Sequence, residues 1–400
     1  MLNDPHKNIF YYYRGPSKRE EEDIIYDTQI EDNTTKALIN CFDYSGNELL
    51  KYFIDYFNLM FKYSSKPQYL LQVSKPKSRP DAQIKFIDKS IYFENKISSK
   101  LDIHQLIRHK ESISKNDILI IITCDKKDKS VANSLKLKHL EWKDIHKCFK
   151  EYEPKDKKER FIINQFTEYL EVIGLSDFTG FTNDDFDYFI NRIDDYKPIV
   201  RNKLEKFSYK VIKALSDEIK TIYTDRHIGI IPKKPETIWF GIRKDQKIKD
   251  KFKHCNFTIE IDSEALNFYT VIRDGKYNQN KPIGIFYKKI KNNFDEFLNT
   301  LKSISGNYYF RISKRIPRYG KKIMPGNERW VLLSTLTLEF VTDETIDYIL
   351  MLLKKVEFPG IHMGLSIKRG DEILKNPEKL IETGKKVIEE EYKVLSFLES

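Results

Sequence analysis

Several motifs that mark large enzyme classes are missing from this 400-residue chain. The sequence contains no G-x-S-x-G, no Walker A pattern and no G-x-G-x-x-G, which disfavours Ser-His-Asp hydrolases, ATP-driven enzymes and dinucleotide enzymes. The four cysteines are widely spaced and include no C-x-x-C pair. We therefore expect neither a zinc site nor a disulfide framework, and the cysteine usage fits a reducing cytoplasm.

Long apolar runs are also missing. The most apolar stretch, ILIII at residues 118–122, is far too short to cross a bilayer and predicts a buried strand. The first 15 residues do not combine a basic segment with an apolar one, so no signal peptide is expected. These features predict a cytoplasmic protein without a membrane partner.

The composition does supply material for folded domains. Hydrophobic residues make up 40% of the chain and aromatic residues 13%, which is enough to bury cores. The length predicts two or three domains. The formal net charge of +10 favours a polyanionic partner. An AT-rich genome offers a second explanation of the charge, because it enriches Lys, Ile, Asn and Tyr without selection for DNA binding.

The first part of the chain has the pattern of an α/β domain. A helix is expected from Asp32, with Asp32, Asn33 and Thr34 as candidate N-cap residues, and a second from Gly46 to about Phe61. Further expected elements are strands at 69–73, 82–86 and 90–97, a helix at 102–113, a strand at 117–123 and a helix within 139–153. This order predicts a mixed sheet covered by helices, over residues 1–153.

The rest of the chain divides into two further segments. Residues 154–222 are rich in helical patterns and are interpreted as a helical connector. Residues 223–400 predict an α+β domain on an antiparallel sheet. Its expected strands lie at 236–242, 257–262, 266–272, 307–313 and 330–340, and its expected helices at 343–355 and 377–398.

Two carboxylates and a lysine in the first domain form the strongest candidate site. Asp81 follows Pro80 at the start of an expected strand, and twelve residues separate it from Glu94 in the triplet Glu94-Asn95-Lys96. Alternate residues of a strand share a face, so Glu94 and Lys96 project together, and the hairpin returns Asp81 beside Glu94. Paired carboxylates suit a hard divalent cation such as Mg²⁺, which can activate water and stabilise charge on a phosphate.

This arrangement resembles the PD-(D/E)XK nuclease superfamily over about residues 20–150. Pro80, Asp81, Glu94 and Lys96 match its motif, and the surrounding order of helix, hairpin, helix and strand agrees with its restriction-endonuclease-like α/β core. Members often carry an active-site Glu on the first helix, and Glu31 matches it. Many also place a Gln on the helix after the triplet, with a Tyr four residues later. Gln105 matches, whereas the later position is His109.

The resemblance implies specific roles for these residues. Asp81 and Glu94 ligate Mg²⁺, for which Mn²⁺ is a possible substitute, and the backbone carbonyl of Asn95 completes the shell. Lys96 assists the attacking water, and Glu31 binds the metal through water. The catalytic residues that the resemblance implies are Asp81, Glu94, Lys96, Glu31 and Gln105, with His109 as a possible contact to phosphate.

The resemblance also implies a function. It predicts a metal-dependent nuclease, acting on DNA rather than RNA and as an endonuclease rather than an exonuclease. Defence or restriction, or alternatively repair, is the expected setting, with a homodimer that cuts both strands.

A basic loop in the last domain is a second candidate for contact with nucleic acid. Between two expected strands the chain carries Lys314, Arg315, Arg318, Lys321, Lys322 and Arg329, interleaved with Tyr319 and Trp330. Basic and aromatic side chains together suit phosphate contacts and base stacking. The alternative is a solvated hairpin loop.

Other interpretations of the same residues stay open. Asp81 and Glu94 could be surface carboxylates beside a solvated Lys96, since 32% of the residues are charged. Glu31 could be a first-turn acid favoured by the helix dipole, and Gln105 a surface amide. At the level of function, the nuclease fold could be catalytically idle or gated by a ligand that the last domain senses. A partner-interaction protein with a composition-driven basic charge is the third hypothesis.

Overall fold

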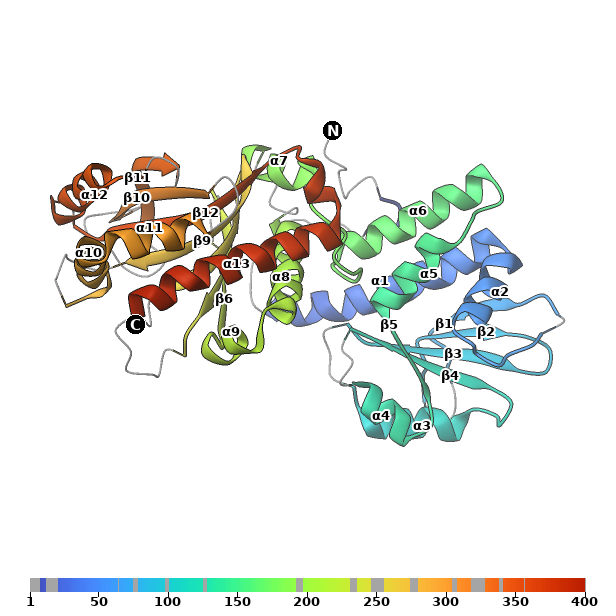
Figure 1. Cartoon of the computed structure of the whole chain (residues 1–400). Helices are drawn as coiled ribbons and strands as arrows, with labels where there is room; N and C mark the ends of the chain where they lie inside the picture. The colour runs from blue at the N-terminus through green and yellow to red at the C-terminus, as the bar shows by residue number, and fades with distance from the viewer. Residues whose placement is uncertain are drawn as a thin grey trace. The chain divides into compact units, whose positions relative to one another are not determined.

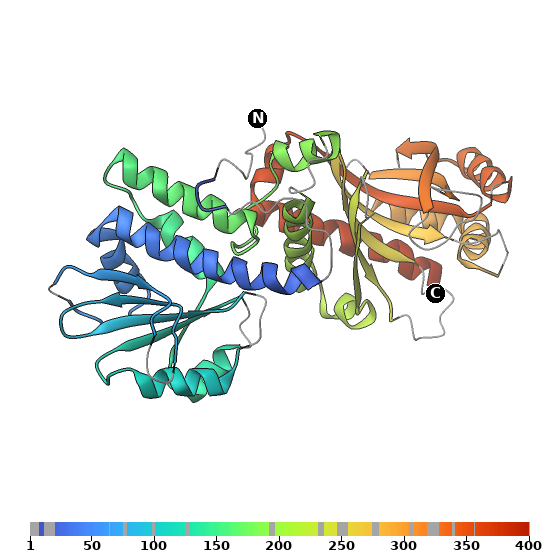
Figure 2. The same ribbon diagram turned by 180° about the vertical axis from the view of Figure 1, so that it is seen from behind.

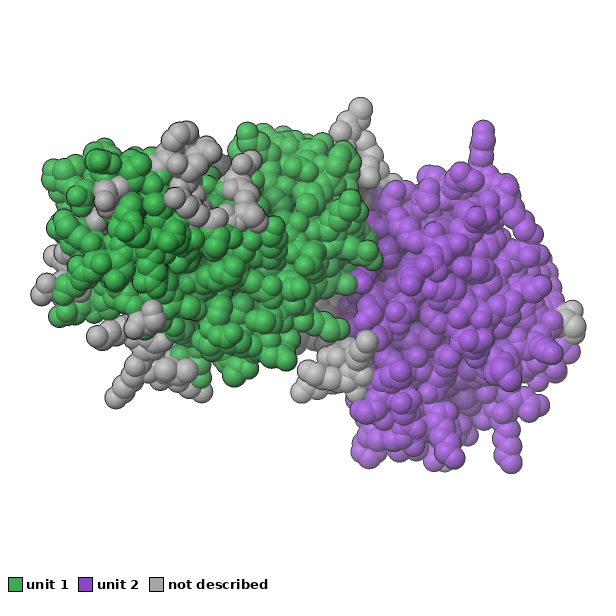
Figure 3. Space-filling model, in the orientation of Figure 1, with its two compact units in different colours: residues 1–2, 178–400 green, residues 3–177 purple. Residues whose placement is uncertain are grey.

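The structure is a computed structural model that describes residues 8–11, 21–63, 65–74, 78–97, 101–124, 128–191, 197–230, 236–245, 255–273, 280–303, 308–317, 328–337, 341–355 and 357–399. The chain forms two units, residues 3–177 and residues 178–400 with 1–2 (Figure 3). The expected helical connector is divided between them. Helix α6 (Lys157–Val172) belongs to the N-terminal unit, whereas α7 (Asn183–Asn191), α8 (Lys197–Ala214) and α9 (Asp217–Ile222) belong to the C-terminal unit.

The N-terminal unit is built on a mixed sheet, as the sequence predicted, and the sheet has five strands in the order β1-β2-β3-β4-β5. The strands are β1 (Gln68–Leu71), β2 (Ala82–Lys85), β3 (Ser90–Asn95), β4 (Ile118–Thr123) and β5 (Lys138–Glu141). The first three pair antiparallel, while β3, β4 and β5 run parallel. The carboxyl ends of the parallel strands therefore meet at one edge of the sheet, beside the start of β2.

Helices cover both faces of this sheet (Figures 1 and 2). Ile91 and Phe93 of β3 pack into a large core with α1 (Glu21–Ser45), α2 (Asn47–Tyr56), α5 (Trp142–Glu151) and α6. Tyr92, on the opposite side of the same strand, packs with Leu106 of α3 (Ile103–Ser112) and Ala132 of α4 (Asp128–Ser134). The alternation along β3 thus assigns each side chain to one of two cores.

Helix α1 corrects the predicted start of the first helix. It begins at Glu21 instead of Asp32, so the expected N-cap residues lie inside it. The hydroxyls of Thr34 and Thr35 donate to the carbonyl oxygens of Ile30 and Glu31, which is the back-bonding of threonines within a helix. The polar run that looked like a cap therefore lies within the helix, with Thr34 buried, and Glu31 is not a first-turn acid. The short elements β5 and α4 were not predicted.

An ion pair joins α5 and α6. His146 Nε2 lies 2.9 Å from Glu171 Oε1, and Lys150 Nζ lies 3.1 Å from the same oxygen. Burial raises the pKa of Glu171, but the hydrogen bond with His146 and the charge of Lys150 outweigh burial and lower the pKa to about 2. The pair therefore stabilises the folded unit wherever Glu171 is ionised.

Replacing Glu171 with Gln is expected to lower the free energy of unfolding by about 1.5–3 kcal/mol at neutral pH. The pKa of Glu171 is lower in the folded state than in the unfolded state. The difference in the free energy of unfolding between the variant and wild type is therefore complete above about pH 4.5 and shrinks as the pH falls toward 2. Chemical denaturation across this range measures it. Glu168→Gln on the same helix is the control, since burial and the charge of Glu171 raise the pKa of Glu168, and neutralising Glu168 removes its repulsion from Glu171. An equal loss in both variants contradicts the assignment.

The C-terminal unit contains a seven-stranded sheet with the order β11-β10-β12-β9-β8-β7-β6. Its strands are β6 (Asp225–Ile230), β7 (Ile238–Arg243), β8 (Asn256–Ile261), β9 (Ala265–Arg273), β10 (Tyr308–Pro317), β11 (Glu328–Thr337) and β12 (Pro359–Lys368). Every pairing is antiparallel, which confirms the predicted antiparallel sheet. The sequence did not predict β6, β12, α10 (Pro282–Asn292) or α11 (Phe294–Lys302), whereas α12 (Asp343–Lys355) and α13 (Pro377–Glu399) match the expected helices.

The basic hairpin differs in part from the predicted loop. Strands β10 and β11 extend through Lys314, Arg315 and Arg329, so these residues lie on strands rather than in a loop. Lys314 and Arg315 are half-buried, and the Arg315 guanidinium lies 5.7 Å from the ring centroid of Phe358. The remaining predicted contacts, Arg318, Lys321 and Lys322, lie outside the described residues. None of the helices in the described segments is both long and apolar enough to pass through a lipid bilayer.

Candidate active site

The hairpin of β2 and β3 brings Asp81 beside Glu94. Ala82 pairs with Phe93, so the preceding residue, Asp81, lies opposite the following one, Glu94. The Asp81 amide donates to the Phe93 carbonyl over 3.0 Å, and Oδ2 of Asp81 accepts from the Asn95 amide over 2.7 Å. Residues opposite each other on antiparallel strands share a face, so the two carboxylates converge.

Glu94 is fully buried at the carboxyl end of β3, with 0% of its side chain exposed. Its Oε1 lies 3.1 Å from Lys96 Nζ, and its Oε2 lies 3.1 Å from Nε2 of His109 on α3. Neither contact has the angles of a hydrogen bond, and in the described part of the chain both oxygens accept none. A buried charge requires compensation, which the Lys96 ammonium supplies on one side, while His109 faces the other oxygen and carries a charge only when it is protonated.

The closeness of Glu94 is reflected in the ionisation of Asp81. Burial and the negative charge of Glu94 raise the pKa of Asp81 to about 7, against the lowering effect of the Asn95 hydrogen bond and the Lys96 charge. For Lys96, burial acts to lower the pKa, but the carboxylate of Glu94 outweighs it and the pKa lies above its usual range. The site thus combines repelling acids with a firmly charged lysine.

Helix α1 holds the chain that carries Lys96. Oε1 of Glu31 accepts from the Ile97 amide over 2.8 Å, and Oε2 lies 3.9 Å from Lys96 Nζ. One turn later, the Thr35 hydroxyl accepts from the Asn95 side-chain amide over 2.6 Å. Glu31 therefore lies close to Lys96 and anchors the segment after β3, and its role in binding metal through water stays a prediction. The Asn95 side chain faces Thr35, which leaves its backbone carbonyl as the possible metal ligand.

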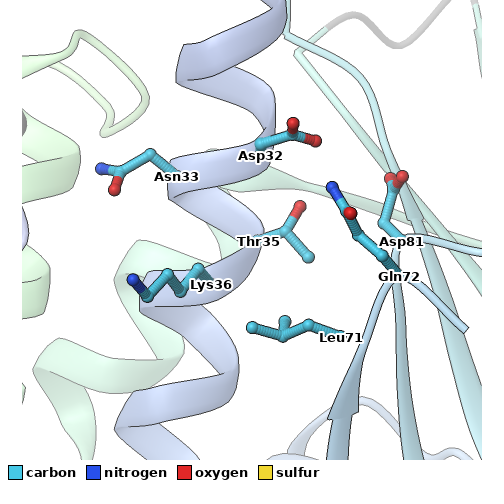
Figure 4. A pocket seen from close by; sticks show the side chains of 7 residues that line it. All are labelled: Asp32, Asn33, Thr35, Lys36, Leu71, Gln72 and Asp81. Atoms are coloured by element: carbon cyan, nitrogen blue, oxygen red, sulfur yellow. The ribbon is translucent and has the colours of Figure 1, made fainter.

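A pocket of about 480 Å³ opens next to Asp81, within the range of ligand-binding pockets. It is lined by Asp32, Asn33, Thr35, Lys36, Leu71, Gln72 and Asp81. Figure 4 shows the carboxylate of Asp32 pointing from α1 toward Asp81, with the Gln72 amide between them. Asp32 also contributes to raising the pKa of Asp81. The sequence analysis placed Asp32 at a helix cap and so missed its position in the pocket. The available signal was the spacing of four residues between Asp32 and Lys36, which puts both side chains on one face of a longer helix.

The donor set fits a hard cation that keeps much of its water. Asp81 and Glu94 supply carboxylate oxygens, of which the two of Glu94 accept no hydrogen bond from the described residues, and the backbone carbonyl of Asn95 is the further candidate. Among those residues, no group of three or more His, Cys, Asp or Glu side chains is arranged as a metal site. Mg²⁺ commonly binds through one or two carboxylates with several waters, so two acids are sufficient.

The two residues predicted on α3 lie in different environments. Gln105 is half-buried one turn before His109. His109 is 2% exposed and faces Glu94, so its position does not support the expected contact with nucleic acid. Its role as a partner of Glu94 was missed, because the sequence does not show which face of α3 packs on the sheet.

No protein-family model matches this sequence, and no curated protein was found to be similar to it. Function is therefore inferred from the site's residues and geometry, together with the motif resemblance.

The resemblance implies metal-dependent cleavage at this site, and for that activity His109→Ala is expected to cause a loss of about 10–100-fold, the usual cost of removing a group that orients a metal ligand. Without the imidazole, Glu94 loses the contact that fixes Oε2. Cleavage rates and Mn²⁺ affinity, measured together, test this. His104→Ala removes an exposed histidine from the same helix and should leave both quantities unchanged. Full activity in His109→Ala, with unchanged Mn²⁺ affinity, contradicts a positioning role.

Proposed function

We propose that the N-terminal unit is a metal-dependent nuclease with a restriction-endonuclease-like fold of the PD-(D/E)XK type. The observation that carries this proposal is the convergence of Asp81, Glu94 and Lys96 at one edge of a mixed sheet, next to an open pocket. An ordinary ion pair on the surface would be exposed and would pair opposite charges. Here Glu94 is fully buried and lies beside a second acid, Asp81. Placing like charges together costs stability, and such costs are typical of functional sites.

Each residue of the site has its own role in the proposed hydrolysis. Asp81 and Glu94 would hold a divalent ion, which would lower the pKa of a bound water and stabilise negative charge on the phosphate. Lys96, held by Glu94 and Glu31, directs its ammonium group at the attacking water or the charged phosphate oxygens. The water oxygen bonds to phosphorus as the bond to the leaving oxygen breaks; the water loses a proton and the leaving oxygen gains one, which gives a phosphate monoester and a hydroxyl group. His109 keeps Glu94 in place from the other side.

DNA is the proposed substrate, and an endonuclease acting as a homodimer in defence, restriction or repair is the proposed biological form. The basic charge of the chain supports a nucleic-acid substrate.

The test is incubation of the full chain with plasmid DNA, single-stranded DNA and RNA in Mg²⁺, Mn²⁺ or chelator. We expect DNA cleavage that the chelator abolishes. Cutting of RNA alone would show that RNA, and not DNA, is the substrate. No cutting of any substrate in either metal would favour a catalytically idle or ligand-gated fold.

A further inference from the structure

Gln72 has a strained backbone conformation at the edge of the candidate active site. Its φ angle of 49° lies in the left-handed region, where residues with a Cβ atom are disfavoured. The Gln72 amide donates to the Asp81 carbonyl over 2.7 Å. The next amide, that of Val73, donates to the Pro80 carbonyl over 3.1 Å, so the neighbouring strand holds this conformation in place. Because strained residues are concentrated at functional sites, the side chain of Gln72 is a candidate for a role in binding.

The register of the sheet places Gln72 next to the two acids. Leu71 at the end of β1 pairs with Ala82 at the start of β2, so Gln72 lies opposite Asp81. Asp81 in turn lies opposite Glu94. Gln72 also lines the pocket beside Asp81, and Figure 4 shows its side-chain amide projecting between α1 and the Asp81 carboxylate. A molecule bound at the two acids therefore lies within reach of this amide.

The Gln72 side chain has hydrogen-bond donors that the protein does not use. Its Oε1 accepts from Nη2 of Arg79, at the other end of the segment that joins β1 to β2. A guanidinium group only donates hydrogen bonds, so the amide oxygen must face Arg79 and the NH2 group must face the other way. Among the described residues this NH2 group has no acceptor, and Gln72 is exposed. Its two N–H bonds are therefore available to a ligand in the pocket.

Arg79 adds a positive charge on the same side of the site. Its side chain is exposed, and its guanidinium forms no ion pair with a carboxylate in the described segments of the chain. Only Pro80 separates Arg79 from Asp81. The carboxylates of the site attract a cation, whereas Gln72 and Arg79 supply donors alone. Amide and guanidinium donors of this kind bind the oxygens of phosphate groups in nucleic acids.

The order of the strands indicates which phosphate these donors reach. Strand β2, which Asp81 precedes, lies between β1 and β3. Gln72 follows β1 and Lys96 follows β3, so the two residues lie on opposite sides of Asp81. In the proposed reaction Lys96 acts at the phosphate that is cut. The donors on the other side of Asp81 are therefore placed for a neighbouring phosphate of the same strand.

We propose that Gln72 and Arg79 bind a backbone phosphate of the nucleic acid next to the phosphate that is cut, and so position the strand at the acids. The inference rests on the proposed nuclease function, and it adds two substrate-binding residues that the motif does not contain. The Gln72 NH2 group and the Arg79 guanidinium donate to the non-bridging oxygens of that phosphate. The strained backbone at Gln72 is what directs its amide into the pocket.

The test is the binding of fluorescently labelled DNA, as duplex and as single strand, by the full chain, measured by anisotropy. Every protein carries Asp81→Asn and is kept in chelator, so cleavage cannot consume the probe. Gln72→Glu replaces the NH2 donors by a carboxylate of the same size and should weaken binding roughly 10- to 100-fold, the effect of losing a hydrogen bond to a charged group. If Gln72 only held Arg79, the same change would strengthen that pair and leave binding intact. Gln72→Gly relieves the strain and should weaken binding without lowering the midpoint of chemical denaturation.

Arg79→Ala should flatten the dependence of log affinity on log salt concentration by about 0.7–0.9, the contribution of one phosphate contact. Two exposed residues serve as matched controls: Gln68→Glu on β1 adds the same charge, Arg160→Ala on α6 removes the same cation, and both should bind as the parent does.

Weaker binding by both Gln72 variants, with normal binding by the controls, upholds the inference. Equal affinity of Gln72→Glu and Gln68→Glu overturns it, as does an unchanged salt slope in Arg79→Ala or no binding of DNA by the parent. Cleavage by the wild-type chain is measured separately. A wild-type chain that cuts DNA while Gln72→Glu binds normally would overturn this inference alone, whereas binding through Gln72 without any cleavage would overturn the proposed catalysis alone.

Discussion

Replacing Asp81 with Asn is expected to reduce metal-dependent cleavage by at least about 10²–10³-fold while the free energy of unfolding stays the same or rises. The amide is nearly isosteric, and its oxygen can still accept the hydrogen bond from the Asn95 amide. What disappears is one of two carboxylates that repel each other. A residue that costs stability but supports turnover is the signature of a functional site.

Cleavage assays and chemical denaturation measured on the same preparation test this prediction. The control is Asp88→Asn, which neutralises an exposed aspartate in the turn of the same hairpin and should affect neither quantity. If Asp81→Asn unfolds more easily and cleaves normally, Asp81 is a structural residue and the assignment fails.

Replacing Lys96 with Met is expected to lower cleavage by roughly 10²–10³-fold with little change in Mn²⁺ affinity. Methionine keeps the apolar stem but removes the ammonium group that lies 3.1 Å from Glu94 and 3.9 Å from Glu31. Since Lys96 is not a ligand in the proposed site, metal binding and turnover should separate.

Lys85→Met on β2 removes an exposed lysine of the same sheet and should leave cleavage intact. Far-ultraviolet circular dichroism checks the fold, because Lys96→Met leaves Glu94 buried with less compensation. A folded Lys96→Met protein that cleaves at the wild-type rate is incompatible with the proposed role.

The central part of the candidate site could be predicted because it depends on local chain geometry. The spacing of Asp81, Glu94 and Lys96 across a tight hairpin determines that they share one face, and the periodicity of 82–97 made the hairpin visible. The pairing of Glu94 with His109 depends instead on how α3 packs against the sheet. That is a long-range contact, and residue spacing does not encode it.

Glycines explain much of what was missed in the C-terminal sheet. Strand β12 contains Gly360 and Gly364, which weaken a β pattern, yet a Cβ at Gly364 would lie 1.9 Å from the Phe268 carbonyl oxygen. Gly229 in β6 similarly makes room for Trp239. These glycines let a neighbouring strand or ring approach the backbone closely. Glycine therefore lowers the β propensity of these segments, although the packing of the sheet requires it there.

Helix α1 was shortened in the prediction for a related reason. Residues such as Asp32, Asn33 and Thr34 favour caps when isolated, but here tertiary contacts hold them inside a helix. Thr34 lies 2.8 Å from the hydroxyl of Tyr169, and Asn33 donates to the same hydroxyl over 3.0 Å. Packing of α1 against α6 therefore overrides the local preference.

Binding of Mn²⁺ to the wild-type protein and to Asp81→Asn, measured by electron paramagnetic resonance of the free ion, tests the central claim most directly. Wild type is expected to bind Mn²⁺ through Asp81 and Glu94, and Asp81→Asn is expected to lose this binding while Asp88→Asn retains it. Equal binding of Mn²⁺ by wild type and Asp81→Asn would contradict a metal centre at this pair of carboxylates.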